Sequence, residues 1–295
     1  MKILFATDGS EYSEGAAKLL TRFHFSPVDE IVILHAISWM PIMSNWESLL
    51  TDFREVRDEV VPKILDSASA ILKDTGARVS STFIEDYPDR AIIDMAKSSD
   101  IDLIVMGARG LRGFTSHIVG SVTKTVAVKA ARPVLVIRLP QAGKAGRIKL
   151  LFATDGSPSA EATGKIISSI PFPEDSEAAV VNVLYSAFED IPERFSMEID
   201  DRMKNIVAKM REAEFKESEK AIQTASGLLG SRFPSVEKFT RLGDPPNEII
   251  SAADELGVDI IAVGSSGRRG LGRLGSVSRY ILHHANCSVL IGRTD

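Results

Sequence analysis

Residues 103–136 read LIVMGARGLRGFTSHIVGSVTKTVAVKAARPVLV, and this stretch decides the fold. The apolar run over 103–106 is typical of a strand buried on both faces. Gly107, Gly110 and then Gly120 with Ser121 follow, and the apolar stripe after them predicts a helix that begins there. A second apolar run, over 134–137, predicts another strand. Strand, glycine loop, helix and strand in this order bring backbone N–H groups and the positive end of a helix to a phosphate.

The composition describes a chain of 295 residues with 44% hydrophobic residues, enough for two domains with a core each. The net charge of −5 favours neither a nucleic acid nor an anionic membrane as partner. The single cysteine, Cys287, excludes an internal disulfide and suits a reducing compartment. The first residues do not read as a signal peptide, and no apolar run is long enough to span a bilayer. We therefore expect a soluble, cytoplasmic protein.

The first half alternates predicted strands with predicted helices. The strands are expected at 3–6, 31–37 and 79–84, before the two already described. Ser10 or Ser13 could cap the first helix, and Pro88 suits the start of another. A long amphipathic segment over 53–72 contains Pro62, which predicts a kink or two helices. Strands separated by helices favour a parallel sheet covered on both faces.

The second half repeats the first. LLFATDGSPSAEA at 150–162 restates ILFATDGSEYSEG at 3–15, with an offset of 147, and VDIIAVGSSGRRG from 258 restates IDLIVMGARGLRG from 101, with an offset of 157. The second copy is therefore ten residues longer between these points, and we expect the extra residues in the charged helical region 200–229. PQAGKAG at 140–146 reads as a linker. Two tandem α/β domains are predicted, at 1–140 and 147–295.

Three motifs resemble the universal stress protein family over nearly the whole chain: ATDGS after the first strand, LHAI in the second, and GARG, nine residues and GS after the fourth. In the ATP-binding branch of that family the loop has Gly, two residues, Gly, nine residues, Gly, then Ser or Thr. The resemblance implies two doubly wound domains, each a five-stranded parallel sheet of order 3-2-1-4-5 with helices on both faces. It also implies that the two fifth strands, 134–137 and 289–291, pair as an internal pseudo-dimer, and that two chains could form a homodimer.

The predicted ligand is an adenine nucleotide (ATP, ADP or AMP), with Mg²⁺ as a candidate companion ion. Glycines let backbone amides approach phosphate oxygens, and Ser121 offers a hydroxyl at a helix end that favours anions. Asp8 follows the first strand, where open parallel sheets bind ligands. The resemblance implies that Asp8 touches the adenosine. With the contacts that the resemblance implies, the complete first set is Ala6, Thr7, Asp8, Ala36, Met106, Gly107, Arg109, Gly110, Gly120, Ser121 and Val122.

The second half offers a corresponding set with a shorter loop. Seven residues lie between Gly267 and Gly275, against nine between Gly110 and Gly120, so its amides need not converge on a phosphate. Three arginines, at 268, 269 and 273, could hold a phosphate by charge instead. The second set is Thr154, Asp155, Val183, Gly264, Ser266, Gly267, Gly275, Ser276 and Val277.

Simpler interpretations accompany these motifs. A Gly-x-x-Gly pair is often only a turn, and Ser121 could be only a helix cap. His283, His284 and Cys287 suit a helix end and a packed thiol better than a zinc site. We interpret His35 as a strand-end histidine bonded to a loop; His117 lies in the glycine loop, and Trp39 and Trp46 in a contact loop or lid.

No catalytic residue is predicted. The chain lacks a Walker lysine motif, and no carboxylate beside the glycine loop is an evident activator of water, so at most slow ATP hydrolysis is expected. The hypothesis is a stress-response protein that uses ATP as a regulatory ligand. The alternatives are a nucleotide-free interaction module and an adenylating or flavin-using enzyme of similar sheet order.

Overall fold

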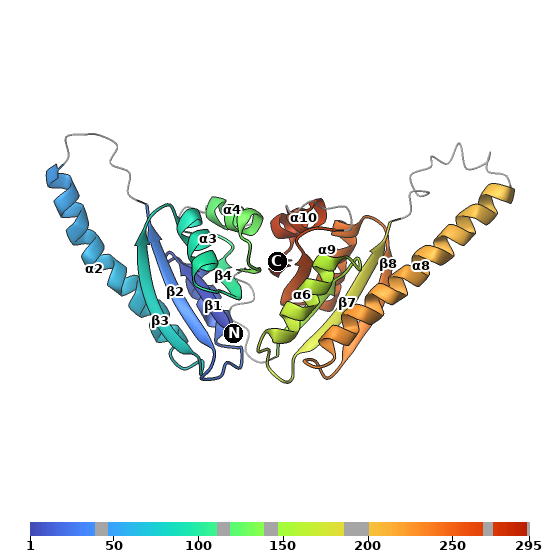
Figure 1. Cartoon of the computed structure of the whole chain (residues 1–295), viewed down its shortest axis with the longest axis horizontal. Helices are drawn as coiled ribbons and strands as arrows, with labels where there is room; N and C mark the ends of the chain where they lie inside the picture. The colour runs from blue at the N-terminus through green and yellow to red at the C-terminus, as the bar shows by residue number, and fades with distance from the viewer. Residues whose placement is uncertain (39–46, 111–118, 139–146, 186–200, 268–273, 294–295) are drawn as a thin grey trace.

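The computed structural model describes residues 1–38, 47–110, 119–138, 147–185, 201–267 and 274–293 (Figure 1). Strands and helices alternate through the first half as β1 (Lys2–Thr7), α1 (Glu11–Leu20), β2 (Glu30–Ile37), α2 (Glu47–Leu72), β3 (Arg78–Glu85), α3 (Pro88–Ser98), β4 (Leu103–Gly107), α4 (Ser121–Lys129) and β5 (Val134–Ile137). The second half repeats them as β6 (Lys149–Ala153), α6 (Pro158–Ser169), β7 (Glu177–Leu184), α8 (Asp201–Leu229), β8 (Val236–Leu242), α9 (Pro245–Leu256), β9 (Ile260–Gly264), α10 (Ser276–His284) and β10 (Ser288–Gly292). In the first half, every predicted strand end lies within one residue of the observed one.

All ten strands belong to one sheet, in the order β3-β2-β1-β4-β5-β10-β9-β6-β7-β8. Pairing is parallel within each half, and the halves join where β5 and β10 pair antiparallel, with Leu135 opposite Leu290. The order 3-2-1-4-5 and the pairing of the two fifth strands are therefore confirmed. The predicted linker, 140–146, lies outside the described residues.

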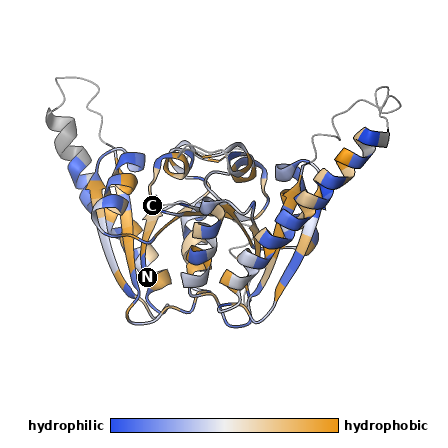
Figure 2. Ribbon diagram, turned by 45° about the vertical axis from the view of Figure 1, so that its right-hand side comes forward, coloured by the Kyte–Doolittle hydropathy of each residue, from blue (hydrophilic) through white to orange (hydrophobic). Residues whose placement is uncertain are grey.

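Alternate residues of each strand face opposite layers of helices. Ile3 and Phe5 pack in a core cluster with α1 and α2, whereas Leu4 and Ala6 pack in the cluster of α3 and α4. Both clusters continue through the second half, with α6 and α8 on one side and α9 and α10 on the other. Hydrophobic residues are accordingly concentrated in the strands and the inward helix faces (Figure 2).

The sequence predicts a kink or two helices at Pro62. The second alternative is wrong, because α2 runs as one helix from Glu47 to Leu72 with Pro62 inside it. A proline inside a helix forfeits one backbone hydrogen bond. Val61, Leu65 and Ala68 around the proline are buried against the sheet. This packing compensates for the lost bond and keeps the segment helical.

The position predicted for the ten extra residues is only partly correct. Helix α8 has 29 residues and α2 has 26, so three of the extra residues lengthen the helix. The other seven precede Asp201, in the connection that follows β7. Both α2 and α8 extend past the ends of the sheet (Figure 1).

The contact between the halves includes reciprocal arginines. Arg138, after β5, donates from Nη2 to the carbonyls of Leu282 (2.8 Å) and His283 (3.3 Å) in the last turn of α10. Arg293, after β10, donates to the carbonyl of Ala127 in α4. Each arginine thus satisfies the C-terminal carbonyls of a helix in the other half, where a cation also suits the helix dipole.

A second contact joins the halves on the α1 side of the sheet. The Phe23 and Phe172 rings lie 5.3 Å apart between centroids, and the amide of His24 donates to the carbonyl of Pro171 at 2.7 Å. Arg22 and Asp259 form a buried ion pair at 3.5 Å. Apolar packing, hydrogen bonds and an ion pair therefore hold this contact together.

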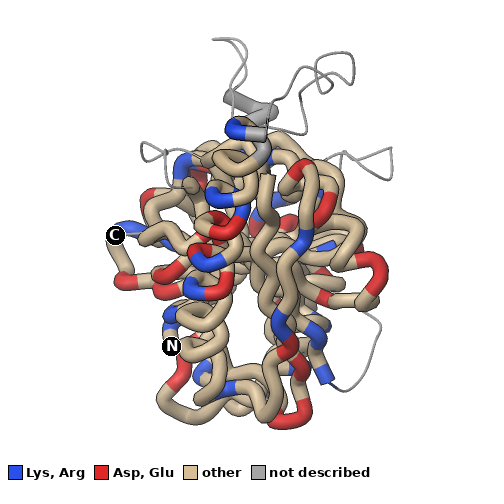
Figure 3. Tube along the Cα trace, turned by 90° about the vertical axis from the view of Figure 1, so that its right-hand side faces the viewer, with Lys and Arg blue, Asp and Glu red and all other residues tan. Residues whose placement is uncertain are grey.

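In the part of the chain that the structure describes, no helix is both long enough and apolar enough to cross a membrane. At the α8 end of the molecule, Lys and Arg are interspersed with Asp and Glu (Figure 3).

Candidate functional site

The turn after β1 fixes the position of Asp8. The amide and the hydroxyl of Ser10 both donate to Asp8 Oδ1, at 3.1 and 2.6 Å. Ser10 is also the N-cap of α1 and accepts a hydrogen bond from the amide of Ser13, so it rather than Ser13 has the capping role. The hydroxyl of Thr7 donates to Ser13 Oγ at 3.0 Å. One hydrogen-bonded turn therefore holds the half-buried Asp8 carboxylate at the C-terminal edge of β1.

The glycine loop after β4 meets that carboxylate directly. A Cβ atom placed on Gly110 would lie 2.2 Å from Asp8 Oδ2, which is far inside van der Waals contact. The same contact recurs in the second half, where a Cβ atom on Gly267 would lie 2.9 Å from Asp155 Oδ2. The two sequence motifs, distant in the chain, thus meet at one point, and a side chain at position 110 would collide with the carboxylate.

Gly107 has a packing role in the fold. A Cβ atom on it would lie 2.9 Å from the backbone carbon of Tyr12 in the first turn of α1. In the second half, a Cβ atom on Gly264 would lie 2.8 Å from Ser159 Oγ and 3.1 Å from the amide nitrogen of Ala160. The first glycine of each loop therefore lets a helix end approach the fourth strand of its half.

Helix α4 begins without a side-chain cap. Gly120 is its N-cap, and the amide of Gly120 donates to the carbonyl of Ala108 at 2.9 Å. Thr123 Oγ1 donates back to the carbonyl of Gly107 at 2.9 Å, which ties the helix to the end of β4. Helices α1 and α6, by contrast, are capped by the hydroxyls of Ser10 and Ser157. Among the described residues, no side chain caps the backbone N–H groups in the first turn of α4, where Ser121 is exposed.

The predicted apolar wall lies on the same side of the sheet as α4. Ala6 and Met106 are register partners in β1 and β4, and both are buried in the α3–α4 cluster. Ala36 and Val122 are partly buried, and Val122 packs against that cluster. The Thr7 side chain instead turns toward α1, so only its backbone could belong to this wall.

Arg109, and Ser266 at the equivalent position of the second half, each contact a side chain in the first helix of their own half that sequence reasoning did not identify as a partner. Arg109 is buried; its guanidinium lies 5.5 Å from the Tyr12 ring centre and donates from Nη1 to Tyr12 Oη at 3.3 Å. The equivalents of Arg109 and Tyr12 in the repeat are Ser266 and Ser159, and the amide of Ser266 donates to Ser159 Oγ at 3.3 Å. This joint replacement between the repeats is the signal that could have revealed the pair.

His35 supports the site from β2. Its Nδ1 lies 2.8 Å from the carbonyl oxygen of Thr7, and in the second half Asn182 Nδ2 donates to the carbonyl of Thr154 at 2.6 Å. His35 is hydrogen-bonded as expected, but its partner is the last residue of β1 and not a loop. Both side chains fix the backbone just before the aspartate.

The second half assembles its set in a similar way. The amide of Ser157 donates to Asp155 Oδ1 at 3.0 Å, and Thr154 Oγ1 accepts from the amide of Gly156 at 3.2 Å. Gly275 is the N-cap of α10, again with no side-chain cap, followed by Ser276 and Val277. Val183, at the end of β7, is partly buried. One difference from the first half, among the described residues, is the missing buried cation at Ser266.

The remaining candidates fall outside this site. Burial raises the pKa of Cys287 to about 12, so it is a packed thiol. His284 stacks on Tyr280 with ring centres 4.0 Å apart. Among the described residues, no group of three or more His, Cys, Asp or Glu side chains is arranged to hold a metal ion. His117, Trp39, Trp46 and the three loop arginines lie outside the described residues.

Comparison with known proteins gives a consistent match. The model of the family described as "Universal stress protein family" matches residues 1–138 and 147–293. A universal stress protein of Mycolicibacterium smegmatis is 26% identical over 308 residues, which cover 99% of this chain and 96% of that one. Universal stress protein MJ0577 of Methanocaldococcus jannaschii is 28% identical over 152 residues, covering 46% of this chain and 94% of that one. The crystal structure of a universal stress protein from Archaeoglobus fulgidus superposes with a TM-score of 0.64 at 21% identity and covers 99% of this chain and 98% of that one.

Proposed function

The chain belongs to the universal stress protein family, and from this premise we propose that its first half binds an adenine nucleotide as a regulatory ligand in a stress response. The observation that carries the proposal is the contact of Asp8 with Gly110 beside the uncapped start of α4. This contact brings a carboxylate, a close-packed glycine backbone and a helix N-terminus to one edge of the sheet. The spacing of the loop resembles that of the ATP-binding branch.

The start of α4 supports phosphate binding. The first-turn N–H groups of a helix and its dipole together favour an anion there, and a single charge at such an end gains about 0.3–1 kcal/mol when exposed, more when partly buried. Ser121 adds a hydroxyl for a phosphate oxygen or for Mg²⁺. Buried Arg109 adds a positive charge to the same loop.

The opposite end of the site suits an adenosine. Ala6 and Met106 supply buried apolar surface, and Ala36 lies two residues beyond Leu34 on the same face of the sheet. The Asp8 carboxylate, at the C-terminal end of β1, could accept hydrogen bonds from a ribose. In this arrangement the adenosine would lie on the apolar wall and the phosphates at the start of α4.

The first half is the stronger of the two sites in this proposal. The second half keeps the aspartate–glycine contact and the uncapped helix, but its loop is two residues shorter and Ser266 replaces the arginine. It therefore lacks the buried charge of Arg109, although its loop contains three arginines of its own, at 268, 269 and 273. We expect tighter binding in the first half and weaker binding, or none, in the second.

The test begins with the purified protein, which is denatured and searched for released nucleotide by chromatography, with its ratio to chain. The nucleotide-free chain is then titrated with ATP, ADP and AMP, each with and without Mg²⁺, by calorimetry. About one tightly bound adenine nucleotide per chain, lost on Gly120→Leu and retained on Gly275→Leu, is the expected result. If no adenine compound is released and no nucleotide shifts the Tm, the nucleotide-free interaction module is the better description. Rapid multiple-turnover hydrolysis would instead indicate an enzyme.

A further inference from the structure

Each half contains a groove between its first two helices, on the face of the sheet opposite the nucleotide site proposed above. The groove between α1 and α2 has a volume of about 210 Å³, and the one between α6 and α8 about 130 Å³. Ala17 and Ala68 of the first groove belong to the α1–α2 core cluster, whereas Ala6 and Met106 belong to the other. The grooves are therefore separate from the apolar wall next to α4.

The same polar set lines both grooves. With the offsets of the repeat, six lining positions of the first groove match six of the second: Thr7, Gly9, Glu14, Lys63, Ser67 and Ala68 correspond to Thr154, Gly156, Glu161, Lys220, Thr224 and Ala225. Other lining positions differ, since Val60 is replaced by Glu217 and Ile64 by Ala221. The helix dipole favours a glutamate in the first turn of α1 and of α6. It does not account for the lysine and the hydroxyl side chain that recur on the facing helix in both halves.

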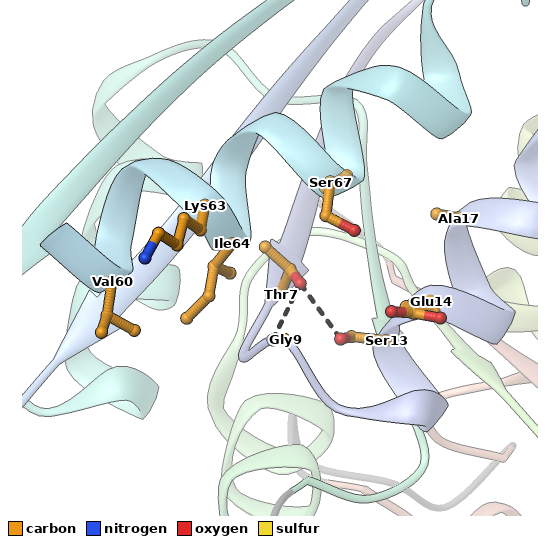
Figure 4. Close-up of a pocket in the computed structure, with 10 residues that line it drawn as sticks. Thr7, Gly9, Ser13, Glu14, Ala17, Val60, Lys63, Ile64 and Ser67 are labelled. Carbon is orange, nitrogen blue, oxygen red and sulfur yellow. Dashed lines mark hydrogen bonds between the residues drawn. The ribbon is translucent and has the colours of Figure 1, made fainter.

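The charges of this set lie on opposite walls. Glu14 projects from α1, Lys63 and Ser67 come from α2, and Thr7 and Gly9 form the floor between them (Figure 4). Lys63 pairs with Glu59 along its own helix at 2.7 Å, and both side chains are largely exposed. Such an exposed pair contributes little, so the ammonium can turn to a ligand at small cost. Ala17 on α1 and Val60 and Ile64 on α2 add apolar atoms to these walls.

The size of the groove limits what could bind. Typical ligand pockets measure roughly 300–1,000 Å³, and a water molecule occupies about 30 Å³. At about 210 and 130 Å³, the grooves suit molecules of about ten non-hydrogen atoms or fewer and are too small for a nucleotide. We propose that each groove binds a small zwitterionic metabolite of the α-amino-acid class, with its ammonium on Glu14 or Glu161 and its carboxylate on Lys63 or Lys220.

Among the described residues, this second site meets the first at the turn after β1. Thr7 and Gly9 of the floor flank Asp8, and the Gly9 amide donates to Thr7 Oγ1 at 3.2 Å. A ligand in the groove would therefore contact the turn that carries the aspartate. Binding in the groove does not require a nucleotide, so the two proposals can fail separately.

The experiment uses the full chain freed of nucleotide, screened against the twenty common L-amino acids at millimolar concentration by saturation-transfer NMR and then by calorimetry. At least one amino acid should bind, with up to two molecules per chain. Glu14→Gln and Lys63→Met should each raise the Kd of the first groove about tenfold, because each removes a charge-assisted contact. Ser67→Phe, at an exposed position, should fill the first groove and abolish its binding without disturbing the core.

Matched controls lie on the outer face of α1. Glu11→Gln and Lys18→Met remove the same charges at exposed positions and should leave the affinity unchanged. Saturating ATP should not displace the amino acid. The proposal is overturned if no amino acid binds, if the signal survives Ser67→Phe together with Thr224→Phe, or if the controls lower affinity as much as the groove variants.

Discussion

Gly110→Ala should weaken both the fold and the nucleotide affinity of the first half, because its new methyl group would lie 2.2 Å from Asp8 Oδ2. Ordinary contact begins near 3.4 Å, so the carboxylate and the loop must separate by about an ångström. Asp8 cannot yield freely, since Ser10 holds its other oxygen at 2.6 and 3.1 Å. Overpacking of this kind costs about 1–3 kcal/mol of unfolding free energy.

The assay is urea unfolding followed by circular dichroism, with a parallel calorimetric titration of ATP. We expect the variant to lose about 2 kcal/mol of stability and its Kd for ATP to rise about tenfold or more, because a displaced Asp8 forfeits a charge-assisted hydrogen bond. Gly267→Ala is the matched control: the corresponding distance to Asp155 Oδ2 is 2.9 Å, so its stability loss should be smaller and the first-half affinity unchanged.

A double-mutant cycle isolates the contact itself. In Asp8→Ala/Gly110→Ala the carboxylate that the methyl group strikes is gone, so the combined stability loss should be clearly smaller than the sum of the two single losses. Full additivity, or a Gly110→Ala chain with unchanged stability and affinity, would refute the reasoning that the two motifs meet at this point.

Three further predictions concern the contact between the halves and the end of α10. Arg138→Met and Arg293→Met should each cost about 1–3 kcal/mol in urea unfolding, since each leaves buried helix-end carbonyls without their donor. Cys287, whose pKa burial raises to about 12, should not react with a thiol reagent at pH 8 until urea unfolds the chain. Burial, and next the charge of Lys124, lower the pKa of His283 below its usual 6.5. The contribution of neutral His283 to stability should therefore be complete above pH 6.5 and lost as the pH falls through the lower pKa of the folded state. His283→Gln should reduce this loss of stability at low pH.

Each of the three has a simple control. Arg211→Met, at an exposed position, should leave the free energy of unfolding within about 0.5 kcal/mol of the wild type. If Arg138→Met and Arg293→Met cost no more than this, the two arginines do not stabilise the helix ends of the opposite half. Fast labelling of the native chain would show that Cys287 is accessible. His284→Gln should keep the wild-type pH profile, because His284 is exposed; equal profiles for all three proteins would exclude His283 as the cause.

Much of the architecture could be predicted because its signals are local. Four β strands of the first half are mainly apolar runs between helical patterns, whereas β3 is indicated by alternation, and the ends of all five lie within one residue of those that the sequence predicts. The repeat of ATDGS and of the glycine loop predicted a second copy, and the resemblance to the family supplied the strand order. Local signals were insufficient where packing opposes them: of the two alternatives at Pro62, a kink or two helices, the second is wrong, because Val61, Leu65 and Ala68 are buried on both sides of the proline and the helix continues.

The sequence by itself determined the elements, the repeat and the residue types that gather at the C-terminal ends of the strands. Only the tertiary structure decided that Asp8 abuts Gly110, that Tyr12 holds Arg109, that the arginines after β5 and β10 cap helices of the opposite half, and that a groove separates α1 from α2. The reason is physical. Periodicity and turn chemistry act over a few neighbouring residues, whereas these contacts join side chains and backbone from segments that become neighbours only after the sheet has formed and the helices have packed on it.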